Sequence, residues 1–298
     1  MKTLDVPHAA VSITTQDGTV LSARLYGARG APVLLASALA IPQRYYEPFA
    51  RWLAARGMMV LTFDLRGMHA SRDATGPRSV RRVQADFLCW ARQDFSACVR
   101  YLQEVSGRAQ ISMVGHSLGA QHLLWADEPT RRAIARCVAV ASGTGYWRDW
   151  AAPSRRFAPL LFFGLIPLLT PLWGYYPGGA LRLVGDLPAG VARQWARWCR
   201  HPDFAIGVEG PALQVHCRAL TVPISAYAFS DDEAITEHCV RQQLALTPHA
   251  PQRLTVLSPE RYGVPRIGHI GALGRHAPEA LRAELSAELM PCTDRPAL

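Results

Sequence analysis

The sequence contains no asparagine and a single lysine, Lys2, among its 298 residues. The 32 basic residues are therefore nearly all arginine, and they exceed the 23 acidic residues to give a net charge of +9. These arginines are scattered, and no basic run is interleaved with aromatic residues as a nucleic-acid surface requires. We therefore expect no nucleic-acid partner, in spite of the basic charge.

Cysteine is present, but in a pattern that does not suggest disulfides. The seven cysteines are an odd number, none belongs to a C-x-x-C pair, and several fall in apolar helical stretches. This usage is typical of reduced thiols in a protein core, so we expect a cytoplasmic location. The first residues, MKTLDVPHAA, also lack the continuous apolar segment of a signal peptide, which makes export unexpected.

The order of the predicted elements indicates an α/β protein. Two alternating, β-branched runs, Val11 to Thr15 and Val20 to Tyr26, flank an Asp-Gly pair and predict an antiparallel hairpin. After it, short apolar runs alternate with stretches of helical periodicity. The predicted strands are 32–37, 58–63, 111–114, 137–141, 223–229 and 253–257, and the predicted helices are 45–56, 83–105, 118–126, 234–246 and 277–289. This alternation predicts a mostly parallel sheet with helices on both faces, with ligands at the carboxyl ends of the strands.

One region breaks the alternation. Residues 145–217 contain five tryptophans, many prolines and an apolar run from Phe157 to Trp173. We interpret them as a lid or cap inserted into a core domain formed by residues 1–144 and 218–298. The apolar face of the cap would close a pocket or make transient contact with a lipid surface, and an extra layer of core is the alternative. A membrane span is less expected, because prolines interrupt a run that is already near the lower length limit.

The stretch Ile111-Ser-Met-Val-Gly-His-Ser-Leu-Gly119 contains the pattern G-x-S-x-G between a predicted strand and a predicted helix. A serine on so sharp a turn needs neighbours without bulk two residues before and after it, which explains Gly115 and Gly119. The turn presents the hydroxyl above the sheet and places the first amides of the helix beside it. Ser117 is therefore the predicted nucleophile, and the amide of Leu118 is a predicted oxyanion donor. A tight turn that merely needs a small polar residue is the alternative.

A serine nucleophile needs a base, and the base needs an acid to orient it. Ser230-Asp-Asp-Glu233 follows a predicted strand, and we choose Asp232 as the acid, with Asp231 second. Ile267-Gly-His-Ile-Gly271 follows the last predicted strand, and His269 is the predicted base. The chain order of serine, acid and histidine is that of hydrolases with this motif. For either aspartate alone, capping of the following helix is an alternative role.

At these residues the chain resembles the α/β-hydrolases, and more narrowly the bacterial members of the serine aminopeptidase-like and monoacylglycerol-lipase-like branch. The likeness covers nearly the whole chain and rests on Gly115-His-Ser-Leu-Gly119, Phe63-Asp-Leu-Arg-Gly67 with Ser71, Ser230-Asp-Asp232 and Ile267-Gly-His-Ile-Gly271. It implies an α/β-hydrolase fold with an inserted helical cap.

The resemblance also bears on the second oxyanion donor. Relatives usually carry His-Gly at the end of the third strand, and the next backbone N–H is the donor. This sequence reads Leu35-Ala-Ser-Ala-Leu-Ala40 there, and we place the donor at Ala38.

Together these residues predict a serine hydrolase that cleaves a carboxylic ester through an acyl-enzyme. The apolar cap favours a small-molecule ester with a hydrophobic acyl or alcohol part, and no metal or organic cofactor is implied. The same triad could instead transfer the acyl group to an alcohol or amine, or act as an aminopeptidase, as the family name suggests. A non-catalytic protein of this fold, used for binding or at a membrane surface, is the alternative outside enzymology. The sequence leaves the oligomeric state open.

Overall fold

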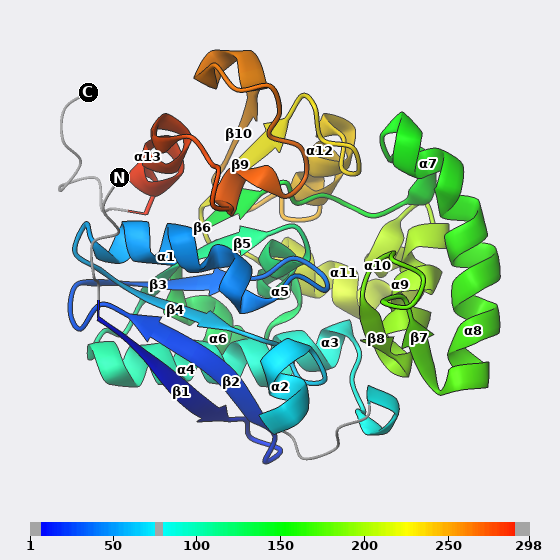
Figure 1. Ribbon diagram of the computed structural model, residues 1–298, viewed down its shortest axis with the longest axis horizontal. Coiled ribbons are helices and arrows are strands. Elements are labelled where there is room, and N and C mark those ends of the chain that lie inside the picture. Colours follow the sequence, from blue (N-terminus) through cyan, green and yellow to red (C-terminus); the bar gives the residue numbers. More distant parts are fainter. Residues whose placement is uncertain (1–6, 75–79, 290–298) are drawn as a thin grey trace.

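The computed structural model describes residues 7–74 and 80–289 and has an eight-stranded sheet at its centre (Figure 1). Its strands are β1 (His8–Thr14), β2 (Val20–Tyr26), β3 (Ala31–Ala36), β4 (Met58–Phe63), β5 (Ile111–His116), β6 (Ile134–Val140), β9 (Ile224–Phe229) and β10 (Gln252–Leu257). They lie in the order β1-β2-β4-β3-β5-β6-β9-β10. The hairpin β1-β2 is antiparallel and β2 runs antiparallel to β4, whereas all pairs from β4 to β10 are parallel. The prediction of a mostly parallel sheet that begins with a hairpin is confirmed.

Helices cover both faces of the sheet because its central strands are apolar on both sides. β4 and β5 are buried at every residue, as is typical of a parallel sheet between two helical layers. One face packs against α1 (Glu47–Ala54) and α13 (Glu279–Ala287). The other packs against α4 (Ser96–Ser106), α5 (Leu118–Trp125), α6 (Glu128–Ala133) and α12 (Glu237–Ala245). Two further short helices, α2 (His69–Ala74) and α3 (Phe87–Cys89), lie between β4 and α4 in the chain.

The segment between the neighbouring strands β6 and β9 is largely helical. It contains α7 (Ala152–Pro159), η5 (Leu160–Leu165), α8 (Ile166–Trp173), the strand pair β7 (Tyr175–Pro177) and β8 (Asp186–Pro188), α9 (Ala189–Arg200), α10 (Phe204–Glu209) and α11 (Pro211–Arg218). Its inner residues, Phe162 and Trp198 among them, are fully buried in the same core as α4 and α5. The ring of Trp198 lies 4.6 Å from that of Trp125 in α5. The inserted segment is therefore packed firmly onto the core, so the cap is also a layer of core.

The apolar run that we expected prolines to interrupt is one continuous helix from Ala152 to Trp173. Pro159 and Pro171 lie inside it, and its middle section η5 is a π-helix. Proline removes an N–H and crowds the carbonyl four residues before it, and for Pro167, also inside this helix, that carbonyl belongs to Phe163 in the wider π section. The prolines thus interrupt the apolar sequence without breaking the helix. By length and mean hydropathy, 1.5, this helix is apolar enough to cross a membrane, and 28% of that stretch is buried against the rest of the protein.

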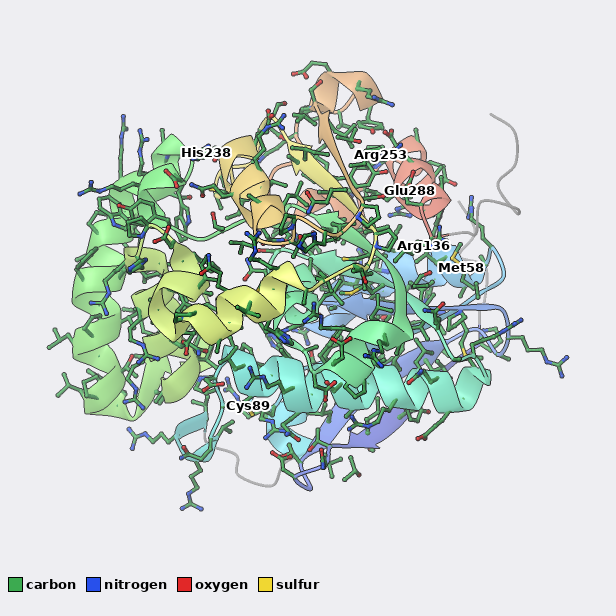
Figure 2. The ribbon with its side chains drawn as sticks, turned by 180° about the vertical axis from the view of Figure 1, so that it is seen from behind. Met58, Cys89, Arg136, His238, Arg253 and Glu288 are labelled. Carbon is green, nitrogen blue, oxygen red and sulfur yellow. The ribbon has the colours of Figure 1, made fainter. Side chains whose placement is uncertain are left out.

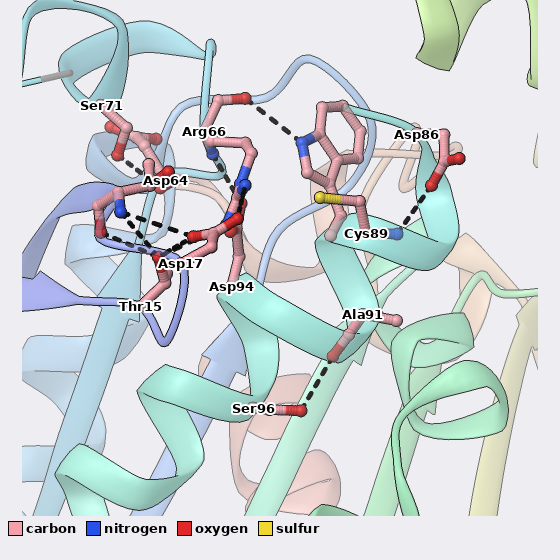
Figure 3. A network of polar contacts seen from close by, with 12 residues as sticks. Thr15, Asp17, Asp64, Arg66, Ser71, Asp86, Cys89, Ala91, Asp94 and Ser96 are labelled. Atoms are coloured by element: carbon pink, nitrogen blue, oxygen red, sulfur yellow. Dashed lines mark hydrogen bonds and ion pairs between the residues drawn. The ribbon is translucent and has the colours of Figure 1, made fainter. Parts of the chain in front are cut away.

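A buried cation holds the loop after β4 in place (Figure 3). Arg66 Nε lies 2.6 Å from the fully buried carboxylate of Asp94 in η3 (Trp90–Phe95), and the same guanidinium pairs with Asp17 in the hairpin turn. Burial raises the pKa of Asp94 to about 6, while the Arg66 guanidinium opposes that rise. In the same loop Ser71 donates a hydrogen bond to the carbonyl of Asp64. The motif Asp64-x-Arg66-Gly-x-x-x-Ser71 thus anchors a loop to the sheet and to the helix beside it.

A second polar cluster, formed by Arg136, Arg253 and Glu288, lies near the β10 edge of the sheet. Figure 2 shows these three residues together. Arg253 Nη2 lies 2.5 Å from Glu288 Oε1, and Arg136 donates to the carbonyl of Glu288. Ser225 also donates to the Glu288 carboxylate. These contacts tie the end of the α13 segment to β6, β9 and β10, and so fix the C-terminal helix against the sheet.

A buried histidine makes the stability of the fold depend on pH. His122 in α5 is fully buried, and neither ring nitrogen has a hydrogen-bond partner among the described residues. Burial lowers its pKa to about 3, whereas an unfolded histidine takes up a proton near pH 6.5. The stability that neutral His122 contributes is therefore complete above about pH 6.5 and is lost as the pH falls toward 3.

We predict that His122→Leu reduces the acid sensitivity of the fold. Between about pH 6 and 4 the free energy of unfolding should fall less steeply in the variant, by up to roughly 1.4 kcal/mol per pH unit. Urea unfolding of both proteins over this range checks the slope, and the difference at pH 8 isolates any change in packing. Parallel stability curves for the two proteins would show that His122 does not resist protonation.

Candidate active site

Ser117 lies at the sharp turn between β5 and α5, as predicted. Its backbone has φ 51° and ψ −119°, a conformation that residues other than glycine rarely adopt. A Cβ at Gly119 would lie 2.1 Å from the carbonyl oxygen of Ala36, and one at Gly115 would lie 2.3 Å from the Cα of Ala120. Both flanking glycines are therefore required, because backbone from β3 and α5 occupies the space of their side chains.

The imidazole of His269 lies between Ser117 and Asp232. His269 Nε2 is 3.0 Å from Ser117 Oγ, and His269 Nδ1 is 2.8 Å from Asp232 Oδ2. The Asp232 side chain is 1% exposed and that of His269 is 16% exposed. The three residues predicted from chain order thus meet at the carboxyl ends of β5, β9 and β10, in one connected line of hydrogen-bonding atoms.

All three acids of the run after β9 act on the histidine loop. Asp232 accepts from the His269 ring through one oxygen, and its other oxygen accepts from the amides of Ala234 and Ile235. Asp231, the second choice from the sequence, accepts instead from the backbone amides of Ile267 and Gly268.

Glu233 accepts from the His269 amide at 3.0 Å and pairs with Arg266. Burial would raise the pKa of Glu233, but these two partners lower it overall, so the carboxylate stays charged. Neither aspartate caps α12, because Thr236 does so through its hydroxyl. Sequence reasoning missed the role of Glu233, although it stands in the acidic run that was singled out.

A second hydrogen-bonded chain runs behind the serine. The Ala38 amide donates to Tyr46 Oη at 2.9 Å, Tyr46 Oη lies 2.8 Å from His116 Nδ1, and His116 Nε2 lies 2.8 Å from the carbonyl of His269. Burial, and then the neighbouring His269, lower the pKa of His116 to about 3, so the ring is neutral. A carbonyl can only accept, so Nε2 carries the proton and Nδ1 accepts from Tyr46. The chain connects the loop after β3, the short 3-10 helix η1 (Gln43–Tyr46) just before α1, the serine turn and the histidine loop.

This chain corrects the predicted oxyanion donor. The N–H of Ala38 already donates to Tyr46, so it is not available to an oxyanion in the cavity. The next amide, that of Leu39, has no hydrogen-bond partner among the described residues, and neither has that of Leu118. Both Leu39 and Leu118 line the cavity that contains Ser117. In the described part of the chain, the first backbone N–H after β3 that is left free toward the cavity is therefore that of Leu39, one residue beyond the predicted Ala38.

The cavity above Ser117 is mostly apolar. Its volume is about 550 Å³, and Ser117 and His269 both line it. The remaining walls come from the β3 loop, α3, α5, the loop before α12, the histidine loop and the inserted segment. They include Leu39, Ile41, Phe87, Trp150, Phe157, Leu161, Leu183, Val184, Trp195, Phe204, Ile235 and Ile270. Among the described residues that line the cavity, none is an Asp, Glu, Lys or Arg. In residues 7–74 and 80–289, no cluster of three or more His, Cys, Asp and Glu side chains is placed to hold a metal.

Comparison with known proteins agrees with this architecture. The sequence matches the alpha/beta hydrolase family over residues 27–284, and no curated protein matches the chain. Among solved structures, the alpha/beta hydrolase GrgF from Penicillium sp. sh18 is 19% identical, with 95% of this chain and 99% of that chain covered and a TM-score of 0.60.

An esterase from Pyrococcus furiosus is 16% identical, with 96% and 92% covered and a TM-score of 0.58. A hydrolase from Pseudomonas aeruginosa is 17% identical, with 95% and 98% covered and a TM-score of 0.57. At these identities the structural matches show a shared fold. Because the family match extends over most of the chain, the protein belongs to the alpha/beta hydrolase family.

Proposed function

We propose that the protein is a serine hydrolase that cleaves carboxylic esters through a triad of Ser117, His269 and Asp232. The observation that carries the proposal is the placement of His269, with Nε2 3.0 Å from Ser117 Oγ and Nδ1 2.8 Å from Asp232. A base within hydrogen-bond reach of a hydroxyl, itself held by a carboxylate, is the arrangement that activates a serine.

The proposed reaction has two steps. Ser117 Oγ attacks the ester carbonyl carbon while His269 Nε2 takes the hydroxyl proton, and Asp232 stabilises the imidazolium that forms. His269 then gives this proton to the leaving alcohol, which leaves Ser117 acylated. In the second step His269 takes a proton from water, whose oxygen attacks the acyl carbon. His269 then gives this proton to Ser117 Oγ as the acyl–serine bond breaks, which releases the acid and restores the free serine. The amides of Leu118 and Leu39 are the proposed donors to the oxyanion in both steps.

The cavity supports a neutral, hydrophobic substrate. Apolar side chains dominate its lining, and the described part of the chain places no carboxylate there to bind the free amino group that an aminopeptidase recognises. Within the family we therefore propose an esterase whose substrates carry an apolar acyl group. This proposal favours the resemblance to the monoacylglycerol-lipase-like branch over the resemblance to the aminopeptidase-like branch.

A fluorophosphonate probe tests the nucleophile. We expect covalent labelling of the wild-type protein and none of Ser117→Ala, because the probe reacts with a serine that an adjacent base has activated. Ser154→Ala is the matched control, since Ser154 lines the same cavity and donates to the carbonyl of Glu233. It should label like the wild type. Labelling that persists in Ser117→Ala would remove the hydrolase proposal.

Esters of graded acyl length test the substrate class. With p-nitrophenyl esters we expect kcat/KM to rise about fourfold for each added methylene, until the cavity is filled, because each buried CH₂ contributes about 0.8 kcal/mol. Phe157→Ser should flatten this rise, since Phe157 is an apolar wall of the cavity. If kcat/KM is highest for the acetate ester and falls as the acyl chain lengthens, a preference for a hydrophobic acyl group is excluded.

The chain behind the serine predicts that Tyr46 is a positioning residue. Tyr46→Phe leaves the amide of Ala38 and Nδ1 of His116 without a partner, so the β3 loop and the histidine loop lose their link. We expect kcat to fall about tenfold, a loss of roughly 1.4 kcal/mol of transition-state stabilisation, with KM nearly unchanged.

Tyr176→Phe is the control for this variant, since Tyr176 is also fully buried and its hydroxyl has no hydrogen-bond partner among the described residues. It should keep the wild-type kcat. Equal kinetics in Tyr46→Phe and the wild type, with both proteins folded by circular dichroism, would count against the positioning role.

A further inference from the structure

The outer face of the long helix Ala152–Trp173 is apolar and uncovered. The helix lies at the edge of the molecule in both Figure 1 and Figure 2. Its exposed large side chains are Phe157, Leu160, Phe163, Leu168, Leu172 and Trp173. Leu168 and Leu172 are 61% and 66% exposed, whereas Phe162 and Ile166 on the other side are fully buried. A contiguous row of this kind goes beyond the single apolar residues that are normal on a soluble surface, and it marks an interaction site.

Arginines border this row. Arg193, Arg197 and Arg200 follow one another along α9 and line a groove of about 430 Å³. The opposite wall of the groove is formed by Ile166, Pro167 and Pro171 of the long helix. Of the described residues that line the groove, Asp86 alone is acidic, and Glu209 lies 4.0 Å from Arg197. The groove therefore has a net positive charge.

The cationic border is in direct contact with the apolar row. The guanidinium of Arg200 lies 5.5 Å from the ring of Phe163. At the other end of the helix, Arg155 and Arg156 are exposed, and the helix contains no acidic residue. The face thus combines projecting leucine and aromatic side chains with a border of one charge sign.

We propose that this face docks on the surface of an anionic lipid bilayer. The leucine and aromatic side chains enter the region of the acyl chains, and the arginines of the α9 groove meet the lipid phosphates. Charge complementarity favours this occupant over a second copy of the chain, because a symmetric contact would bring one arginine border against the other. The buried inner side of the helix keeps its contacts with the core, so the helix lies along the bilayer rather than across it.

Docking in this orientation would bring the cavity close to the lipid. Phe157 is exposed on the outer face and also lines the cavity above Ser117, and Leu161, one turn later, lines it as well. A lipid acyl chain would therefore meet a continuous apolar path from the bilayer to the serine. This last step rests on the proposed esterase function, whereas the docking itself does not.

Vesicle flotation tests the docking with full-length Ser117→Ala protein, which keeps hydrolysis out of the measurement. Vesicles of phosphatidylcholine alone are compared with vesicles that also contain phosphatidylglycerol. We expect binding to be at least about tenfold stronger on the anionic vesicles, and to weaken at high salt, since several arginines contribute. Both Leu168→Ser with Leu172→Ser and Arg193→Gln with Arg197→Gln should weaken binding by about tenfold or more.

Matched controls come from other exposed positions. Val215→Ser in α11 changes a residue that is 67% exposed, and Arg132→Gln in α6 removes an exposed arginine. Both should bind vesicles as the parent protein does, and circular dichroism checks that every variant is folded. The proposal is overturned if no vesicle is bound, if the leucine and arginine variants bind vesicles as strongly as the two control variants, or if the leucine changes alter only the sedimentation mass of the protein. A wild-type protein that the fluorophosphonate probe does not label would overturn the hydrolase chemistry and leave these outcomes unaffected.

Discussion

The backbone conformation of Ser117 is the constraint on which the rest of the site depends. A non-glycine residue with positive φ costs about 1–3 kcal/mol and persists only where its surroundings hold it. Here the Ser117 N–H donates to Val140 of β6, and its carbonyl accepts from Ser142. β5 lies between β3 and β6 in the sheet, so the turn sits on a fully buried strand. The same packing forbids any side chain at Gly115 or Gly119.

Two hydrogen-bonded networks hold His269 in place, one on each side of its loop. The acids after β9 fix the loop from one side, because Asp231 and Glu233 accept from consecutive amides while Asp232 accepts from the ring. His116 fixes it from the other side by donating to the His269 carbonyl. A charged His116 would be repelled by a protonated His269, so a ring that burial keeps neutral suits this position. Both the backbone and the imidazole of His269 are therefore held before any substrate arrives.

Much of the core was predictable because its signals are local. Apolar runs bounded by turns gave the parallel strands, and the glycines around Ser117 marked a turn that admits few sequences. Chain order then selected the histidine and the acid without any distance information. The division of labour among Asp231, Asp232 and Glu233 could not be predicted, because three adjacent acids differ only in where the fold points them. The same holds for Tyr46, whose partners are eight and 70 residues away.

The inserted segment was the least predictable part for a related reason. The sequence indicated a helical cap but not where its helices lie, because proline disfavours the interior of a helix on local grounds. Burial of Phe162, Ile166 and Trp198 in the common core compensates for the backbone hydrogen bonds that proline removes. Tertiary packing thus overrode local propensity on one side of the helix. The same helix has a wall of the cavity at its N-terminal end and an uncovered apolar face on its outer side. One continuous helix carries all three surfaces, and Phe157 and Leu161 are its contribution to the cavity wall. Docking at a bilayer, as proposed, would in this way act directly on access to Ser117.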